Sequence, residues 1–484
     1  MKSTSILFRP AFACIIGLTL LSSCRLPQGL SGTDQLRTSK SFAYIPDSVQ
    51  TDQDLPAWRD FFKDQYLVAL IDTAIRTNLD LKVAVQRIYQ AQAGFRYSRQ
   101  LFFPTVNARA GVGTTRFGDY TVDGVGNFDT NLSNNITEEQ RIPGPVPDLF
   151  LGLETSWEAG FAGKLRNRKR AAQARYLSSQ FGRQHVQTNV VAGVARLYYE
   201  LLALDNEIKI VRQNQELQQQ ALDIVGIQKQ SGQINELAVK QFQVQLLQTK
   251  AIEAELVQMA TATENQLNFL LGRFPQRIPR ADTLVIASQL EVVTTSLPAQ
   301  LIQNRPDIRQ AEQQLRANEA QLKAARASFY PGLNLSGFVA LNGFNPSFFF
   351  NPASLAYTAT GSITAPLFNR NAIRNEYWMQ AAERKQAFYN YQQTVLQGAS
   401  EVSSFYNRMM GYQRVGDFKQ QEVAELKTAT VIANDLFLTG YANYLEVLMV
   451  RRNVLEAEIQ YAEANKEFLH AYVDLYKALG GGWR

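Results

Sequence analysis

Residue types that commonly carry catalytic or metal chemistry are few in this sequence. The chain has two histidines, His185 and His470, and no closely spaced pair that would hold a metal ion or build a histidine-based triad. Two glycine-rich segments, 111–113 and 480–482, lack the strand-to-helix context of a phosphate-binding loop. Carboxylates are plentiful but scattered along the chain. We therefore expect no enzyme activity, no metal site and no cofactor.

The clearest predicted chemistry lies at Cys24. Residues 1–23 place basic residues before an apolar stretch that is too short to span a bilayer, which is the layout of a secretory signal. The segment ends in Leu21-Ser22-Ser23-Cys24, which resembles the bacterial lipobox. We therefore expect cleavage before Cys24, followed by acylation of its thiol and of its new amino group.

The composition agrees with export. Cys14 lies inside the signal and Cys24 is the other cysteine, so the mature chain can form no internal disulfide. Loss of Lys2 and Arg9 with the signal lowers the formal net charge from +6 to +4, and no long basic run argues for a nucleic-acid partner. No apolar run after residue 23 approaches the roughly 18 residues of a transmembrane helix.

Four short segments alternate apolar and polar side chains, at 105–116, 149–158, 332–341 and 356–367. Each has about the 9 to 11 residues that a tilted membrane strand needs. We predict two β-hairpins with their apolar side toward lipid and their polar side, including Glu154 and Glu158, toward water. The alternative is two solvent-exposed hairpins on a soluble helical protein.

Four strands cannot close a membrane barrel, because the smallest such barrels use about eight. An open sheet edge in lipid would leave backbone groups unpaired at a cost of several kcal/mol each. One chain is therefore expected to share its barrel with copies of itself. Two copies would supply eight strands and three would supply twelve.

The two halves of the chain resemble each other. An offset of 227 residues aligns Pro104 with Pro331, and an offset of 208 residues aligns Gly232 with Gly440. We predict a tandem duplication, with each half built as helix, hairpin, long helix and helix. The predicted organisation is a signal peptide at 1–23, an acylated N-terminal segment at 24–62, a first repeat at 63–272 with its hairpin at 105–160, a linker at 273–300, a second repeat at 301–480 with its hairpin at 332–367, and a C-terminal tail at 481–484.

The long helices follow from the absence of proline. Segments from about 165 to 231 and from about 373 to 439 contain none, and their apolar positions recur three or four residues apart. Each segment would form a helix of about 100 Å at 1.5 Å per residue. Returning helices at about 235–271 and 443–479 are expected to pack against them as antiparallel coiled coils. The fold class is thus mainly α with membrane β, with long antiparallel coiled-coil helix pairs and a transmembrane β-barrel shared between subunits; the family resemblance given next implies that the helices form a long coiled-coil barrel as well.

Several motifs together carry a family resemblance. They are Trp58 through Phe62, Asp307-Ile308 with Ala311-Glu312, Ala325-Arg326-Ala327 before Phe329-Tyr330-Pro331, Ser156-Trp157-Glu158, and the ending Leu475 through Trp483. The chain resembles the outer membrane efflux proteins, the TolC/OprM-like outer membrane factors of tripartite efflux pumps, in their lipoprotein branch. The resemblance implies a homotrimer with a twelve-stranded β-barrel in the outer membrane, continuous with a twelve-helix barrel that crosses the periplasm.

The implied function is that of an exit duct and not of an enzyme. Small molecules would pass from an inner-membrane pump of the RND type and a periplasmic adaptor, the membrane fusion protein, across the periplasm and outer membrane to the exterior. The implied partners are two further copies of the chain, the adaptor, the pump and outer membrane lipid, without nucleic acid. Selectivity in this architecture resides mostly in the pump, so the resemblance names no cargo.

The resemblance also places a pore gate after the second tip turn. Leu445 falls on a position that constricts the pore in lipoprotein-branch relatives, and Met449 stands where those relatives have the aspartate of an acidic ring. Glu446, or Glu236 in the first half, is a candidate for substitute charge. A coiled-coil core position is the alternative for Leu445, and a solvated helix face is the alternative for the two glutamates.

The tip turns themselves are predicted at Ser231-Gly232 and Thr439-Gly440, because glycine readily adopts the positive φ that ends a helix. By the resemblance these turns contact the adaptor, and the tip helices pack closed at rest and untwist when the adaptor docks.

Two other classes of protein remain as alternatives. A stand-alone porin would need all its strands in one chain and would have little use for such long helices. A periplasmic coiled-coil spacer would not need alternating strands. The surface loops at about 117–148 and 342–355 would either close the outer mouth or seat in the membrane interface.

Overall fold

The computed structural model describes residues 42, 44–46, 50–51, 55–160, 162–282, 295–296, 303–366 and 371–484. The predicted signal peptide and the predicted acylation site Cys24 lie outside these residues. The described chain divides into two compact units. Unit 1 contains residues 91–175 and 315–387, and unit 2 contains the described parts of 35–90, 176–314 and 388–484.

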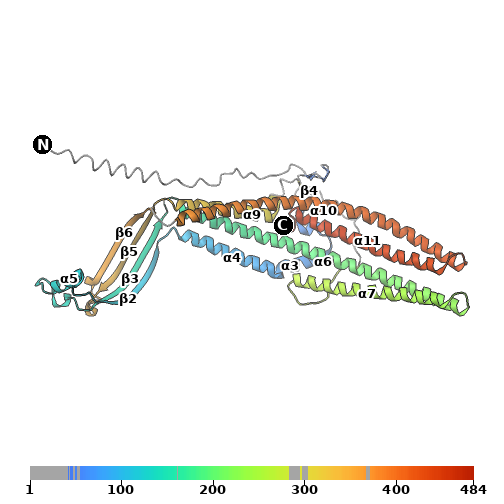
Figure 1. Cartoon of the computed structure of the whole chain (residues 1–484), viewed down its shortest axis with the longest axis horizontal. Coiled ribbons are helices and arrows are strands. Elements are labelled where there is room, and N and C mark those ends of the chain that lie inside the picture. Colours follow the sequence, from blue (N-terminus) through green and yellow to red (C-terminus); the bar gives the residue numbers. More distant parts are fainter. Residues whose placement is uncertain are drawn as a thin grey trace. The chain divides into compact units, whose positions relative to one another are not determined.

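Unit 1 is built on a four-stranded antiparallel sheet in the order β2-β3-β5-β6 (Figure 1). Its strands are β2 (Thr105–Thr115), β3 (Val146–Ala159), β5 (Gly332–Gly343) and β6 (Leu355–Thr364). The four predicted strands are therefore all present. The structure extends β3 toward its N-terminus, and the predicted end of the last strand at residue 367 lies outside the described residues.

Both hairpin loops of unit 1 contain short helical segments. The first loop carries α5 (Val122–Asn131) and the 3-10 turn η2 (Glu138–Gln140), and the second carries η4 (Pro346–Phe348) and η5 (Pro352–Ser354). The side-chain amide of Asn345 donates to the carbonyl oxygen of Glu139 at 3.2 Å and so joins the two loops. A cavity of about 740 Å³ lies between them.

Most of the remaining chain is helical, and the helices come in pairs of equal length. Helices α4 (Leu79–Gln100) and α9 (Pro306–Ala327) have 22 residues each, α6 (Lys164–Gln230) and α10 (Ala372–Leu438) have 67, and α7 (Glu236–Leu270) and α11 (Tyr444–Ala478) have 35. The long and returning helices begin and end within about one residue of their predicted bounds. Within the described ranges, no helix is both long enough and apolar enough to cross a membrane.

The N-terminal part of unit 2 contacts α11 near its end and α6 near its middle. It contains β1 (Gln50–Thr51), which pairs in parallel with β4 (Thr295–Ser296), and the helices α2 (Trp58–Phe61) and α3 (Gln65–Thr77). The ring of Phe61 stacks on that of Tyr476 with centroids 3.8 Å apart, and the hydroxyl of Tyr198 donates to Asp64 Oδ2 at 2.6 Å. Phe61 of the Trp58–Phe62 motif thus packs on α11, and Asp64, at the start of α3, bonds to α6.

A buried arginine joins three helices of unit 2. Arg305, directly before α9, makes two hydrogen bonds to Asp307 at 2.7 and 3.1 Å and a salt bridge to Glu401 on α10 at 2.8 Å. It also donates to the carbonyl oxygen of Ala478 at the end of α11, at 2.9 Å. Burial disfavours the charged carboxylate of Asp307, but its hydrogen bonds to Arg305 outweigh burial and lower its pKa.

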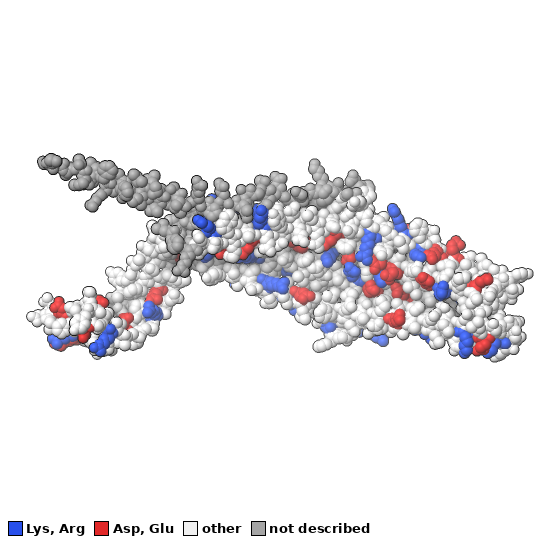
Figure 2. Space-filling model, in the orientation of Figure 1, with Lys and Arg blue, Asp and Glu red and all other residues white. Residues whose placement is uncertain are grey.

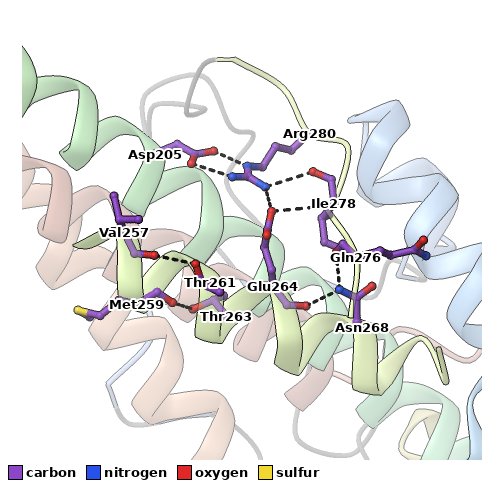
Figure 3. A network of polar contacts seen from close by, with 10 residues as sticks. All are labelled: Asp205, Val257, Met259, Thr261, Thr263, Glu264, Asn268, Gln276, Ile278 and Arg280. Carbon is purple, nitrogen blue, oxygen red and sulfur yellow. Dashed lines mark hydrogen bonds and ion pairs between the residues drawn. The ribbon is translucent and has the colours of Figure 1, made fainter. Parts of the chain in front are cut away.

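A second arginine fixes the segment that follows α7 (Figure 3). Arg280 lies between Asp205 on α6 and Glu264 on α7 and bonds to both, with its Nη2 donating to Asp205 Oδ1 at 2.9 Å. Nearby, the side-chain amide of Asn268 donates to the carbonyl oxygen of Gln276 at 2.6 Å. Burial opposes the charge of Arg280, but the hydrogen bonds to the two carboxylates prevail and raise its pKa. The start of the predicted linker at 273–300 is therefore held against α6 and α7.

Candidate functional site

The sheet of unit 1 has one apolar and one polar face, and large side chains on the apolar face are exposed. Its exposed large apolar side chains all lie on the predicted lipid-facing side: Val106, Val112, Leu151, Leu153, Leu335, Val339, Leu355, Tyr357 and Ile363. On the space-filling face in Figure 2, charged residues are sparse over the strands and frequent, with both signs, over the helices. A contiguous apolar surface of this kind calls for a nonpolar environment outside the chain.

The polar face carries paired charges instead of catalytic groups. Arg109 on β2 bonds to Glu154 on β3 at 2.8 Å, and Lys164 at the start of α6 bonds to Glu158 at 2.8 Å. The hydroxyls of Thr105 and Ser156 lie 2.9 Å apart across the same two strands. Both predicted water-facing glutamates therefore lie on the polar face, where each is neutralised by a cation.

Two phenylalanines also project from the polar face, which the sequence analysis did not single out. Phe150 and Phe338 contact each other edge to face with ring centroids 5.6 Å apart, and the guanidinium of Arg109 lies 5.1 Å from the centroid of Phe150. The sequence contains the signal for this placement. Phe150 and Phe338 have even numbers, and the even-numbered Glu154 and Asn334 on the same two strands belong to the predicted polar face.

The two outer strands of the sheet each keep one open edge. Strand β2 pairs with β3 alone, and β6 pairs with β5 alone, within the part of the chain that the structure describes. The strands run in alternating directions, so β6 of one copy could pair antiparallel with β2 of another. An uncovered edge beside an apolar face is a template for pairing with another chain.

The predicted tip turns have the geometry that the glycines suggested. Gly232 and Gly440 have φ values of 77° and 82°. The amide of Gly232 donates to the carbonyl oxygen of Lys229 at 3.0 Å, and that of Gly440 donates to Phe437 at 3.2 Å. Ser231 and Thr439 precede these glycines and are exposed. Both turns therefore end their long helix through a left-handed glycine.

The caps of the returning helices are also the same in both halves. The side chain of Asn235 accepts from the amide of Ala238 at 3.1 Å at the start of α7. That of Asn443 accepts from the amide of Leu445 at 3.2 Å at the start of α11. An asparagine at this position satisfies a helix amide that would otherwise lack a partner.

An apolar cluster joins the two tips inside unit 2. Its buried members are Ala221 and Val225 on α6 and Ala238 and Phe242 on α7, and Tyr444 and Leu448 of α11 pack against them. The pair of α10 and α11 therefore packs through α11 on the pair of α6 and α7. Other positions of α11 near the tip are exposed, among them Leu445, Glu446 and Met449.

The three candidate gate residues are exposed in the single chain. Leu445 is 47% exposed and Met449 is 53% exposed, one helical turn apart, whereas the neighbouring Val447 is buried. Leu445 is therefore not buried within one chain, and both the gate position and the coiled-coil core position stay predictions for it. Glu446 is exposed. The hydrogen bond from Lys229 lowers the pKa of the other candidate, Glu236, which is thus already paired.

Arg451 is a further tip residue, to which the sequence analysis gave no role. Its guanidinium donates to the carbonyl oxygen of Leu217 on α6 at 3.0 Å and to the side chain of Asn434 on α10 at 3.2 Å. Burial lowers its pKa. One side chain therefore links α11 to both long helices, and the sequence signal for it is a cation inside an otherwise apolar helix repeat.

The two histidines lie apart from each other in sequence position and in role. His470 on α11 is buried, with its Nε2 3.2 Å from the carbonyl oxygen of Arg196 and 3.4 Å from Glu200 Oε2. Burial lowers its pKa to about 4, so the ring is neutral near pH 7. His185 bonds to Asn189 one turn along α6 at 3.1 Å. His470 thus lies in a contact between α11 and α6, whereas the bond of His185 stays within α6.

Comparison with known proteins agrees with this geometry. The family described as "Outer membrane efflux protein" matches residues 70–273 and 297–481. The solvent efflux pump outer membrane protein SrpC of Pseudomonas putida is 27% identical over 430 residues, which cover 89% of this chain and 88% of that protein. The cation efflux system protein CusC of Escherichia coli O6:H1 is 27% identical over 430 residues and 88% of each chain. A crystal structure of CusC matches with a TM-score of 0.81 at 24% identity, covering 94% of this chain and 100% of that one.

Proposed function

The chain belongs to the outer membrane efflux protein family, and from that premise we propose that it is the lipid-anchored exit duct of a tripartite pump of the RND type. Proteins of this family are channels of the outer membrane that extend into the periplasm, form trimers, and work with an adaptor and an inner-membrane pump. The observation that carries the proposal is the four-stranded sheet with a bare apolar face and two open edges. Three such sheets give twelve strands and leave no edge unpaired.

The work of this duct requires no catalytic group in the chain. The polar face of the sheet lines the water-filled barrel, and the helices continue the passage toward the pump. SrpC and CusC are named for solvents and cations respectively, so ducts of one fold serve unlike cargoes. We infer that this chain accepts small molecules that its pump selects, and that it does not select them itself.

The periplasmic end of the proposed duct is the pair of tips. Leu445, Glu446 and Met449 would meet their copies in the trimer and narrow the pore there. The turns at Ser231-Gly232 and Thr439-Gly440 are solvent-exposed ends that an adaptor can reach, and a Cβ at either glycine would meet nothing within 4 Å. Arg451 would hold α11 in place at this end, because it joins α11 to α6 and α10.

The proposal is tested first by the mass of the detergent-purified mature protein, measured by light scattering with the detergent contribution subtracted. A trimer is the expected result, since twelve strands close the barrel. A stable monomer, both in detergent and after reconstitution into lipid, would remove the shared barrel and with it the placement of the pore and gate.

The gate assignment predicts the ion selectivity of Met449→Asp. Three added carboxylates at one level of a narrow pore should attract a passing cation by on the order of 1 kcal/mol and repel an anion, so the ratio of cation to anion permeability should rise by at least about fivefold. Reversal potentials in planar bilayers under a salt gradient measure this ratio. Met449→Asn is the uncharged control and should leave it unchanged. Equal selectivity in the two variants would show that Met449 does not line the passage.

The lipid anchor predicts the labelling pattern of cysteine variants. Cys24→Ala should incorporate no radiolabelled palmitate, because it removes the thiol that the lipobox presents for acylation. Cys14→Ala should be labelled like the unchanged protein, since residue 14 is cleaved off with the signal. Label that persists in Cys24→Ala would contradict the proposed anchor.

A further inference from the structure

Helix α5, in the loop between β2 and β3, presents an apolar stripe that the described part of its own chain leaves exposed. Val122, Val125, Phe128 and Leu132 are between 56% and 90% exposed. Their spacing of three, three and four residues places them along one side of the helix. Figure 1 shows α5 beyond the ends of the strands, next to the end of β2. Water therefore meets a row of large apolar groups on a helix that the fold holds in a defined place.

The helix is fixed at both ends, so the stripe has a defined direction. Thr121 caps its start by accepting from the amide of Gly124 at 3.1 Å. At its other end, Asn131 accepts from the amide of Ile142 at 2.8 Å and donates to the carbonyl oxygen of the same residue at 2.9 Å. These polar contacts hold α5 against the return segment of its own loop. None of them covers the stripe.

A helix of this composition needs a partner surface to be stable. It has ten residues, and isolated helices shorter than about 12 residues are marginal in water. Gly124 and Gly126 lie inside it, and each costs about 1 kcal/mol relative to alanine. Packing of the apolar stripe is the contribution that can offset these costs.

The charge of α5 disfavours a membrane surface as the partner. Helices that lie on membranes carry lysine and arginine along their polar side. Residues 117–131 contain Asp119, Asp123 and Asp129 and no lysine or arginine. The helix is thus acidic on its polar side, which suits a neutral protein surface better than a lipid headgroup layer.

The position of α5 points to a second copy of this chain. Strand β2 is an edge strand, and six residues separate its last residue, Thr115, from the first residue of α5. In the trimer that we propose as the functional form, β2 pairs with β6 of the partner subunit at about 4.8 Å. The loop that leads into β6 then rises beside α5, well within the reach of a six-residue connection of up to about 20 Å.

That loop offers a matching surface. Residues 344–355 carry no charged side chain and contain four phenylalanines. Phe350 is 77% exposed, and its ring contacts Phe349 edge to face at 5.1 Å between centroids. We propose that the apolar stripe of α5, with Phe128 at its centre, packs on Phe350 of the partner subunit, so that three such contacts link the loops around the outer mouth. This inference rests on the trimer of the proposed function.

Disulfide trapping in the full-length protein tests the contact. Phe128→Cys combined with Phe350→Cys should produce covalent dimers and trimers on non-reducing gels of outer membranes, because no native cysteine other than acylated Cys24 remains in the mature chain. Asp123→Cys combined with Phe350→Cys is the matched control, since Asp123 lies on the same helix but outside the stripe, and it should stay monomeric on such gels. Phe128→Asp with Phe350 unchanged should lower the temperature at which the trimer dissociates in detergent.

Any other outcome overturns the inference, and the mass measurement shows whether the proposed trimer fails with it. The mass of the same cysteine variants by light scattering reports whether the trimer exists. A trimer without covalent species, in which a fluorophore on Phe128→Cys is quenched by nitroxide-labelled lipid, would place the stripe in the membrane interface. A trimer in which this cysteine reacts freely with a membrane-impermeant maleimide would leave the stripe in water. A monomer would contradict the proposed function as well.

Discussion

Replacing Gly152 with valine should abolish assembly of the trimer in the outer membrane. A Cβ at residue 152 would lie 2.2 Å from the Cβ of Ala340, 2.5 Å from its Cα and 2.5 Å from the carbonyl oxygen of Val339. These atoms belong to β5 in the central pairing of the sheet, so they cannot move without breaking the ladder that joins the two hairpins. Overpacking of a tight site costs about 1–3 kcal/mol per site, and the trimer contains the site three times.

The measurement is the amount of heat-modifiable, SDS-resistant trimer in outer membrane fractions, with light scattering on whatever protein is recovered. Gly111→Val is the matched control, because Gly111 lies on the same face of the neighbouring strand and a Cβ there meets nothing within 4 Å. It should assemble almost normally. Equal amounts of trimer in the two variants would show that the contact between Gly152 and Ala340 does not constrain folding.

The different roles of Gly152 and Gly111 could not be predicted from the sequence, although the strands that carry them could. The four strands could be predicted because a period of two is a local property, and the long helices because proline is absent over about 65 residues. The turns could be predicted for the same reason, since Gly232 and Gly440 each end an uninterrupted helical pattern. The need for glycine at 152 could not, because it depends on which residue of β5 lies opposite, and that register is set between segments far apart in the chain.

For the candidate gate, too, some features could be predicted from the sequence and others could not. The positions of Leu445 and Met449 on a helix after the tip turn followed from the pattern, and their exposure on one side agrees with a role in the passage, which stays a prediction. The partners of Arg451 depend on the rotation of α11 relative to α6 and α10, which a helical period does not determine. The equal lengths of the paired helices favour the predicted tandem duplication, and it too stays a prediction.

The second large effect is expected at Arg305. Replacement by methionine keeps much of the side-chain volume but leaves Asp307 and Glu401 without their cation and the carbonyl oxygen of Ala478 without its donor. Breaking a buried ion pair by removing one partner costs about 3–5 kcal/mol, because the remaining charge stays uncompensated. Local opening of the contact between α9, α10 and α11 should become easier by this amount.

Hydrogen exchange of peptides from the start of α9 measures this opening, and its protection should fall by a factor of roughly 10² to 10⁴. Arg309→Met is the control on the same helix. The guanidinium carbon of Arg309 lies 4.1 Å from the centroid of the Phe181 ring. A partly exposed cation–π contact of this kind contributes only about 0.5–1 kcal/mol to stability. Similar losses of protection in the two variants would mean that the buried charges contribute no more than this surface contact.

The pH dependence of the Arg305→Met effect identifies its electrostatic origin. Because Arg305 holds the pKa of Asp307 below its usual value, this carboxylate stabilises the folded state above the unfolded pKa of about 3.9, and that contribution is lost as the pH falls through the lowered folded pKa. In the variant, Asp307 has no cation to favour its charged form. Protonation of Asp307 in acid should therefore reduce the stability of the variant less than it reduces the stability of the unchanged protein. The difference in thermal stability between the two should therefore be largest near pH 7 and shrink below about pH 4. A difference that stays constant over this range would assign the loss to packing of the Arg305 side chain, because packing does not depend on the protonation of Asp307.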